Sequence, residues 1–174
     1  MTRGNRSESI RNVMDGLRRI VRDLRLTARE AERGAGISGA QLFVLQALSE
    51  SSAASLNDLA ERTLTDQSSV SVVVKRLVER KLVARKPSNE DGRRVELSLT
   101  SAGRRLLAKC PEPTQARLVS ALRRLSPDEL AALTVGVRAL EREMGTGGTA
   151  RMFFDEEAPS GRTTRTARSS SLRP

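Results

Sequence analysis

The chain has 174 residues and a formal net charge of +10, because 31 lysine and arginine residues outnumber 21 acids. Its 37% hydrophobic content supports a core, and the excess of arginine, whose planar guanidinium suits phosphate, predicts a nucleic acid as the first candidate among polyanionic partners. With no histidine and one cysteine, the chain excludes a Cys/His zinc site, an internal disulfide and an imidazole-based triad, and the lack of tryptophan and tyrosine disfavours single-strand binding by base stacking.

A first helix is predicted from about Ser7 to Glu32. Apolar residues spaced by three and four form one stripe along it: Ile10, Val13, Leu17, Ile20 and Leu24, widened by Met14, Val21 and Ala28. A stripe this regular is typical of a helix that meets another helix or another chain, although a surface helix packed on its own domain would show a similar pattern. A membrane-surface helix is disfavoured by the interspersed acids. We assign residues 7–36 to dimerisation.

Two further helices are indicated by their capping residues. Ser38 with Gln41 three residues later has the pattern of a capping box, and the core face that follows carries Leu42, Leu45 and Leu48. After a short polar break, Ser55 is placed to cap a short helix, with Asp58 at the complementary position.

The next helix is predicted from residue 67 to residue 80, after the two N-cap candidates Thr65 and Asp66. One face is apolar and is expected in the core: Val70, Val73, Val74 and Leu77. Valine-rich sequence also suits a strand, but the cap, the 3.6-residue period and the basic residues at the C-terminal end favour a helix. The other residues suit a recognition helix in the DNA major groove, and we predict DNA contacts from Gln67, Ser68, Ser69, Ser71, Val72, Lys75 and Arg76. An ordinary helix with one polar side remains the alternative at this point.

A β-hairpin is predicted after this helix. Residues 82–86 form a short strand stopped by Pro87, Asp91 and Gly92 form a turn pair, and apolar residues alternate from residue 95 to residue 99. A basic ribbon beside a helix-turn-helix becomes a wing that can contact the DNA backbone or the minor groove, and the predicted wing residues are Arg85, Asp91, Arg93 and Arg94. A solvated hairpin without a DNA partner is the alternative.

The C-terminal part is predicted to hold more helices and a second apolar seam. Thr100 caps a helix that runs toward Cys110, the segment Pro111-Glu112-Pro113 breaks it, and Ser126-Pro127-Asp128-Glu129 begins the last helix. That helix carries a stripe formed by Leu130, Leu133, Val137 and Leu140. Because a small domain cannot cover stripes at both ends of the chain, we expect a homodimer that uses residues 7–36 and 101–145. Residues 146–174 are predicted to be a disordered basic tail.

The order of these parts resembles the winged helix-turn-helix of the multiple antibiotic resistance regulator (MarR) family over about residues 7–144. The resemblance is carried by Leu77, Leu82, Val83, Arg85, Asp91, Gly92, Arg93, Val95, Leu97, Leu99, Thr100 and Gly103. It implies a mainly α fold with a small β-hairpin wing, in which residues 37–100 are the DNA-binding domain, Arg93 reaches DNA and Asp91 orients a nearby arginine. The family often has glycine after the recognition helix, where this chain has Lys81, and a left-handed backbone there would cost about 1 kcal/mol relative to glycine.

The resemblance also implies a homodimer on pseudo-palindromic duplex DNA and a small aromatic or carboxylate effector. Leu17, Leu42 and Phe43 could line an apolar pocket, but no polar cluster identifies the ligand site. Cysteine-based sensing occurs in the family, yet Cys110 lies beside the proline break and is expected to be a buried structural thiol.

We therefore expect a cytoplasmic, nucleoid-associated transcription regulator, by family analogy a repressor, with no catalytic activity, no cofactor and no metal. No segment approaches the roughly 20 apolar residues of a membrane span. A serine hydrolase with a lysine base is disfavoured because no serine and lysine pair lies in a recognisable motif. The main alternative is a nonspecific basic coat or RNA-binding protein.

Overall fold

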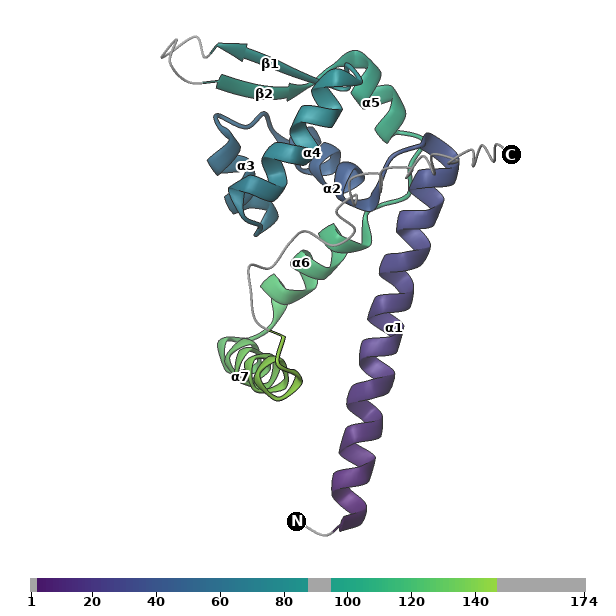
Figure 1. Cartoon of the computed structure of the whole chain (residues 1–174), viewed down its shortest axis with the longest axis vertical. Coiled ribbons are helices and arrows are strands. Elements are labelled where there is room, and N and C mark those ends of the chain that lie inside the picture. Colours follow the sequence, from purple (N-terminus) through teal and green to yellow (C-terminus); the bar gives the residue numbers. More distant parts are fainter. Residues whose placement is uncertain (1–2, 88–94, 147–174) are drawn as a thin grey trace, which may run out of the picture.

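The structure is a computed structural model that describes residues 3–87 and 95–146. Within these residues the elements are α1 (Arg3–Ala35), α2 (Gly39–Glu50), α3 (Leu56–Thr63), α4 (Gln67–Glu79), β1 (Val83–Pro87), β2 (Val95–Leu99), α5 (Ser101–Leu107), α6 (Thr114–Arg124) and α7 (Pro127–Met144). The fold is thus mainly α with one two-stranded hairpin, as the sequence predicts. Figure 1 shows α2 to α5 and the hairpin gathered at one end, with α1 extending from them and α6 leading to α7.

Helix α2 is the centre of the core. Its residues Leu42, Val44 and Leu45 are fully buried, and it contacts α1, α3, α4, α5, α6 and β2. Such a helix needs apolar residues on all sides, and its sequence supplies them. The predicted capping box fixes its start, since the Gln41 N–H donates to Ser38 Oγ at 3.2 Å and the Ser38 N–H donates to Gln41 Oε1 at 3.3 Å.

The hairpin is antiparallel, with Val83 opposite Leu99 and Arg85 opposite Leu97. A third segment joins it at Ala53, whose N–H and carbonyl exchange hydrogen bonds with Leu97, both at 2.8 Å. Pro87 was predicted to stop the first strand; instead it is the last residue of β1, opposite Val95. A proline is tolerated there because an edge position requires no donated ladder hydrogen bond.

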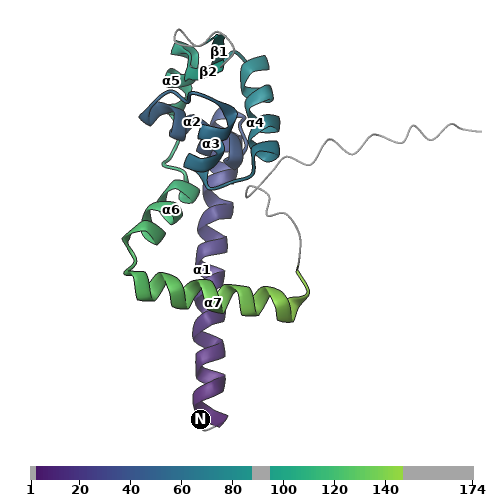
Figure 2. The same cartoon turned by 90° about the vertical axis from the view of Figure 1, so that its left-hand side faces the viewer.

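The α1 and α7 helices differ from the rest because they bury little. Helix α1 is longer than the predicted 7–32 helix and buries Leu24 and Ala31 near its C-terminal end, whereas no residue of α7 is buried. In Figure 1 α7 is seen end-on, and in Figure 2 it runs across the direction of α1. The predicted break between α5 and α6 and the Ser126 capping box of α7 are both present.

Candidate nucleic-acid interface

The interface begins with the turn that joins α3 to α4. Ser55 caps α3 by accepting the Asp58 N–H at 3.0 Å, and the C-cap residue after α3 is Leu64, which has a left-handed φ of 52°. Asp66 then caps α4: its Oδ1 accepts the Ser69 N–H at 2.9 Å and the Ser68 hydroxyl. The turn between the two helices is therefore fixed by local hydrogen bonds, which set where α4 begins.

The Asp66 carboxylate stays ionised under ordinary conditions. The hydrogen bond from Ser68 and then those from Ser69 lower its pKa from 3.8 to about 2. A negative charge at this position also interacts favourably with the positive end of the helix dipole of α4. The Ser68 hydroxyl, predicted to contact DNA, is thus oriented by Asp66 in this structure.

The two faces of α4 are separated as predicted, with one correction. Five of its residues are buried against the core: Ser69, Val70, Val73, Val74 and Leu77. The opposite face presents exposed Gln67, Ser68, Ser71, Val72 and Lys75, with Arg76 half-buried. Ser69 was predicted among the DNA contacts but is only 8% exposed, because the first turn of α4 packs against the core at that point.

The C-terminal end of α4 is anchored to the junction of α1 and α2. The Arg80 guanidinium donates to the Gly36 carbonyl at 2.6 Å and to Gln41 Oε1 at 3.4 Å. From sequence alone Arg80 is one of the basic residues near the negative end of the helix dipole of α4, since nothing local indicates a contact 44 residues away. This contact holds α4 in a defined orientation relative to α1.

Lys81 follows with a left-handed φ of 58°, so the lysine does not alter the turn that glycine would favour. Its N–H donates to the Val78 carbonyl at 2.9 Å and the Leu82 N–H donates to the Leu77 carbonyl at 2.9 Å, which is the Schellman pattern. Thr100 Oγ1 donates to the Lys81 carbonyl at 2.8 Å and so ties this turn to the end of the hairpin.

A groove of about 480 Å³ lies between α3, α4 and the hairpin. Its lining consists of Ser55, Leu56, Asn57, Gln67, Ser71, Val74, Lys75, Val78, Glu79, Arg85, Val95 and Leu97. Three predicted recognition residues and one predicted wing residue therefore meet at one concave surface, with Lys75 and Arg85 as its cations. The other predicted wing residues, Asp91, Arg93 and Arg94, lie outside the described residues, as does the predicted tail at 147–174.

The two predicted seams are exposed in the single chain. On α1 the side chains of Ile10, Val13, Leu17 and Ile20 are between 41% and 57% exposed, and on α7 those of Leu130, Leu133, Val137 and Leu140 are between 41% and 46% exposed. Rows of exposed apolar residues of this length are typical of interaction surfaces.

The residues suggested for an effector pocket do not come together. Leu42 lines a cavity of about 10 Å³ between α1, α2 and α6, but Leu17 is exposed and Phe43 is buried in the core, and neither lines this cavity. A volume of that size is about that of one water molecule.

Cys110 is half-buried, and its Sγ–H donates to the Leu106 carbonyl at 3.4 Å. Burial raises the pKa of its thiol. Among residues 3–87 and 95–146 there is no group of histidine, cysteine and acidic side chains arranged to hold a metal ion. No described helix combines the length and the hydropathy required to cross a bilayer.

Comparisons with known proteins agree with this architecture. The family model described as the MarR family matches residues 35–94. The HTH-type transcriptional repressor MdtR of Bacillus subtilis (strain 168) is 37% identical over 68 residues, which are 39% of this chain and 44% of MdtR. The chain thus aligns with less than half the length of this curated relative.

Solved structures extend the likeness to the flanking helices. A MarR family protein from Bacillus stearothermophilus has a TM-score of 0.51 at 24% identity, over 80% of this chain and 97% of that chain. A structure of Bordetella bronchiseptica BpsR, whose DNA binding is described as regulated by 6-hydroxynicotinic acid, has a TM-score of 0.50 at 29% identity, over 78% and 94% of the two chains. The winged helix-turn-helix region, residues 35–94, thus matches the MarR family, and the fold of the longer chain is that of these solved structures.

Proposed function

We propose that this protein is a DNA-binding transcription regulator that acts on duplex DNA as a homodimer. The observation that carries the proposal is the exposed polar face of α4, which borders a groove shared with the basic hairpin. Short side chains such as Ser71 let a helix backbone approach base edges in the major groove, and Lys75 at the same face provides a cation for a phosphate.

The wing supplies the sequence-independent part of the proposed interface. Arg85 lies on β1 and lines the groove. Arg93 and Arg94 follow in the hairpin sequence, and we propose that Arg93 contacts the DNA backbone or minor groove with Asp91 orienting a neighbouring arginine. Phosphate contacts of this kind fix the register of the protein while the α4 side chains read sequence.

Selection of bound duplexes from a random pool tests the proposal, because a two-fold dimer should recover a pseudo-palindrome with half-sites about one DNA turn apart. On the selected duplex, Arg93→Ala should weaken binding to all sequences and reduce the slope of log K against log salt by about one. Ser71→Ala should instead change the preference between operators. Arg142→Ala, an exposed charge on α7, is the control and should change neither quantity. Unchanged affinity and slope for Arg93→Ala would contradict the proposed wing contact.

The homodimer is proposed from the exposed seams of α1 and α7. Ile20 and Leu26 both lie on α1 with similar exposure, 43% and 42%, but only Ile20 belongs to the seam. Ile20→Lys should therefore shift the protein toward monomer in sedimentation velocity, whereas Leu26→Lys should not. If the two variants sediment alike, the seam is not the dimer interface.

We further propose that the regulator is a repressor released by a small aromatic acid. Two observations about relatives support this: MdtR is named a repressor, and BpsR is described as regulated in DNA binding by 6-hydroxynicotinic acid. In vitro transcription from a promoter that contains the selected operator should fall when the protein is added, and 6-hydroxynicotinate or benzoate should restore it. Activation of the promoter would refute the repressor role. Failure of both acids to restore transcription would refute release by a small aromatic acid.

The alternative is a nonspecific nucleic-acid coat or RNA-binding protein, which the net charge of +10 would also suit. Competition of the labelled selected duplex against bulk DNA and RNA separates the two. A regulator should retain a specificity ratio on the order of a thousandfold or more, and a ratio near one would favour the coat protein.

A further inference from the structure

Helix α1 carries a strip of arginine side chains that the proposed function does not use. All nine basic residues of α1 are arginine, and six of them fall within a sector about 80° wide when successive residues are placed 100° apart. These six, here called the arginine ridge, are Arg11, Arg18, Arg22, Arg25, Arg29 and Arg33, and each is exposed. The ridge spans about 33 Å along the helix at 1.5 Å per residue.

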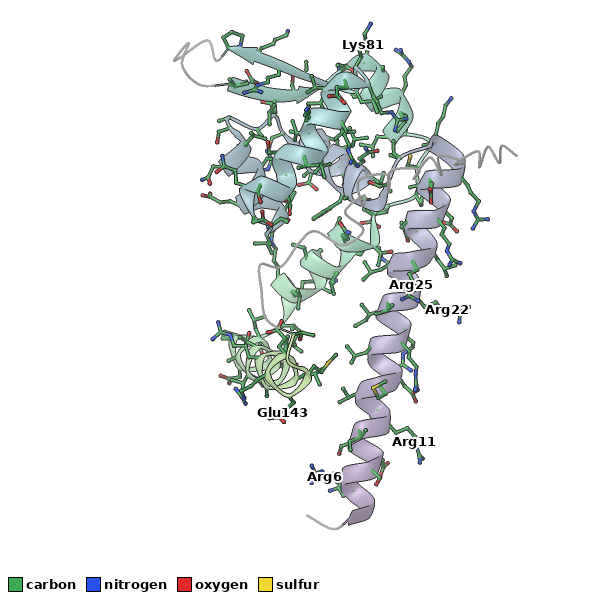
Figure 3. The ribbon with its side chains drawn as sticks, viewed as in Figure 1. Arg6, Arg11, Arg22, Arg25, Lys81 and Glu143 are labelled. Carbon is green, nitrogen blue, oxygen red and sulfur yellow. The ribbon has the colours of Figure 1, made fainter. Side chains whose placement is uncertain are left out.

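The ridge is distinct from the apolar seam of the same helix. The centre of the seam, near Leu17, lies about 120° around the helix from the centre of the ridge. In Figure 3 Arg11 and Arg22 point away from α6 and α7, whereas Arg6, which is outside the ridge, points from the other side of α1. A partner that covers the seam therefore comes close to Arg25, which lies about 20° from Met14, but leaves Arg11, Arg22 and Arg29 in solvent.

Few acids neutralise the ridge. Asp15 lies within the sector and forms an ion pair with Arg18 at 2.8 Å. Glu8 and Glu32 lie at its margins, and both are exposed. In the part of the chain that the structure describes, Asp15–Arg18 is the only ion pair on α1, so five arginines of the ridge have no carboxylate partner there.

We propose that the arginine ridge is a second, sequence-independent site for the sugar-phosphate backbone of duplex DNA. A duplex carries one phosphate per about 3.4 Å of axis on each strand, so a straight row of cations about 33 Å long faces a complete turn of the polyanion. Guanidinium groups bind phosphate oxygens through two parallel hydrogen bonds, which suits a row made of arginine without lysine. Length and regular spacing favour this linear polyanion over the scattered carboxylates of a folded acidic protein.

The duplex on the ridge is not the duplex on α4. In Figure 1 α3 and the hairpin, which border the groove, project to the left, and in Figure 3 Arg11 and Arg22 project to the right. One straight duplex cannot reach both surfaces of a protomer. The site therefore goes beyond operator recognition: it would let an operator-bound dimer hold a second DNA segment.

A capture experiment on the full-length protein tests the ridge. Beads carry the selected operator duplex saturated with protein, and a fluorescent duplex of unrelated sequence is then added at several salt concentrations. Variant Arg11→Gln/Arg22→Gln/Arg29→Gln removes three charges from the ridge with a residue that favours helix. The matched control removes three exposed charges from α6 and α7: Arg123→Gln, Arg138→Gln and Arg142→Gln.

The wild type and the control should capture the second duplex, and the ridge variant should capture at least about tenfold less, with a salt slope reduced by roughly three. All three proteins should bind the operator on the beads equally. Equal loss in both variants, or no capture by the wild type, overturns the proposal. Displacement of the duplex by poly-glutamate at equal charge concentration would make the ridge a site for an acidic protein and would also overturn it.

A second arm tests the ridge without an operator. If selection recovers no operator, the protein is immobilised directly and titrated with the unrelated duplex. Binding that the ridge variant loses and the control retains would support the ridge alone, and equal binding by both variants would overturn it.

Discussion

Lys81 is the position at which the structure predicts a gain in stability from one substitution. It occupies the left-handed residue of the Schellman turn after α4, with φ of 58°. A residue with a Cβ costs about 1–2 kcal/mol in this region, and glycine removes that cost. Glycine also gives the unfolded chain more freedom, which offsets about 0.5–1 kcal/mol. We therefore expect Lys81→Gly to raise the free energy of unfolding by about 0.5–1 kcal/mol.

The side chain of Lys81 is exposed and makes no hydrogen bond or ion pair with any other described residue, so little else is lost. Lys81→Ala is the control, because it removes the charge but keeps the Cβ and the strained backbone. Urea unfolding at fixed protein concentration should give a higher midpoint for Lys81→Gly at an unchanged slope, and a midpoint near wild type for Lys81→Ala. Equal midpoints for the two variants would show that the left-handed backbone of residue 81 does not lower the free energy of unfolding.

Three other measurements check particular contacts. Gly103→Ala should destabilise the fold by about 1–3 kcal/mol, because its Cβ would lie 2.2 Å from the Leu82 carbonyl oxygen. Gly34→Ala, whose Cβ would have nothing within 4 Å, should stabilise α1 slightly, and equal thermal midpoints for the two variants would contradict both expectations. Asp66→Asn removes a carboxyl whose pKa is lowered to about 2. The wild type should therefore be more stable than the variant above about pH 4 and lose this advantage as the pH falls toward 2, and a difference in urea midpoint that does not change with pH would contradict the lowered pKa. Because burial raises the pKa of the Cys110 thiol, native protein at pH 8 should react with iodoacetamide more slowly than protein unfolded in urea, and equal rates by mass spectrometry would refute the assignment.

The helix starts were predictable from sequence because their determinants are local. The caps at Ser38, Ser55 and Ser126 each use a side chain and a backbone N–H three residues apart, so neighbouring letters contain the whole interaction. The left-handed turn at Lys81 was not predictable in this way, because lysine carries no local signal for it and only the family resemblance drew attention to the position.

Most of the contacts that the sequence did not predict join residues that lie far apart in the chain. Ser69 directly follows the exposed Gln67 and Ser68, but it stands four residues before buried Val73 and so falls on the apolar face of α4. The partners of Arg80 are 39 and 44 residues away, and Ala53 joins the hairpin at Leu97 from outside any strand pattern. The Arg80 and Ala53 contacts have no periodic or spacing signal, because the residues that specify them belong to other elements.

The same long-range contacts connect the proposed dimer seams to the proposed DNA reader. Arg80, at the end of α4, bonds to the carbonyl of Gly36 just beyond α1, and Thr27 of α1 contacts Thr114 of α6 through their hydroxyl oxygens at 2.6 Å. A change in the direction of α1 or α6 therefore displaces the residues that anchor α4. Since the seams would fix α1 and α7 relative to a second copy, the spacing between two copies of α4 depends on few contacts, and an effector that alters the α1–α6 contact has a short physical path to the DNA-reading surface.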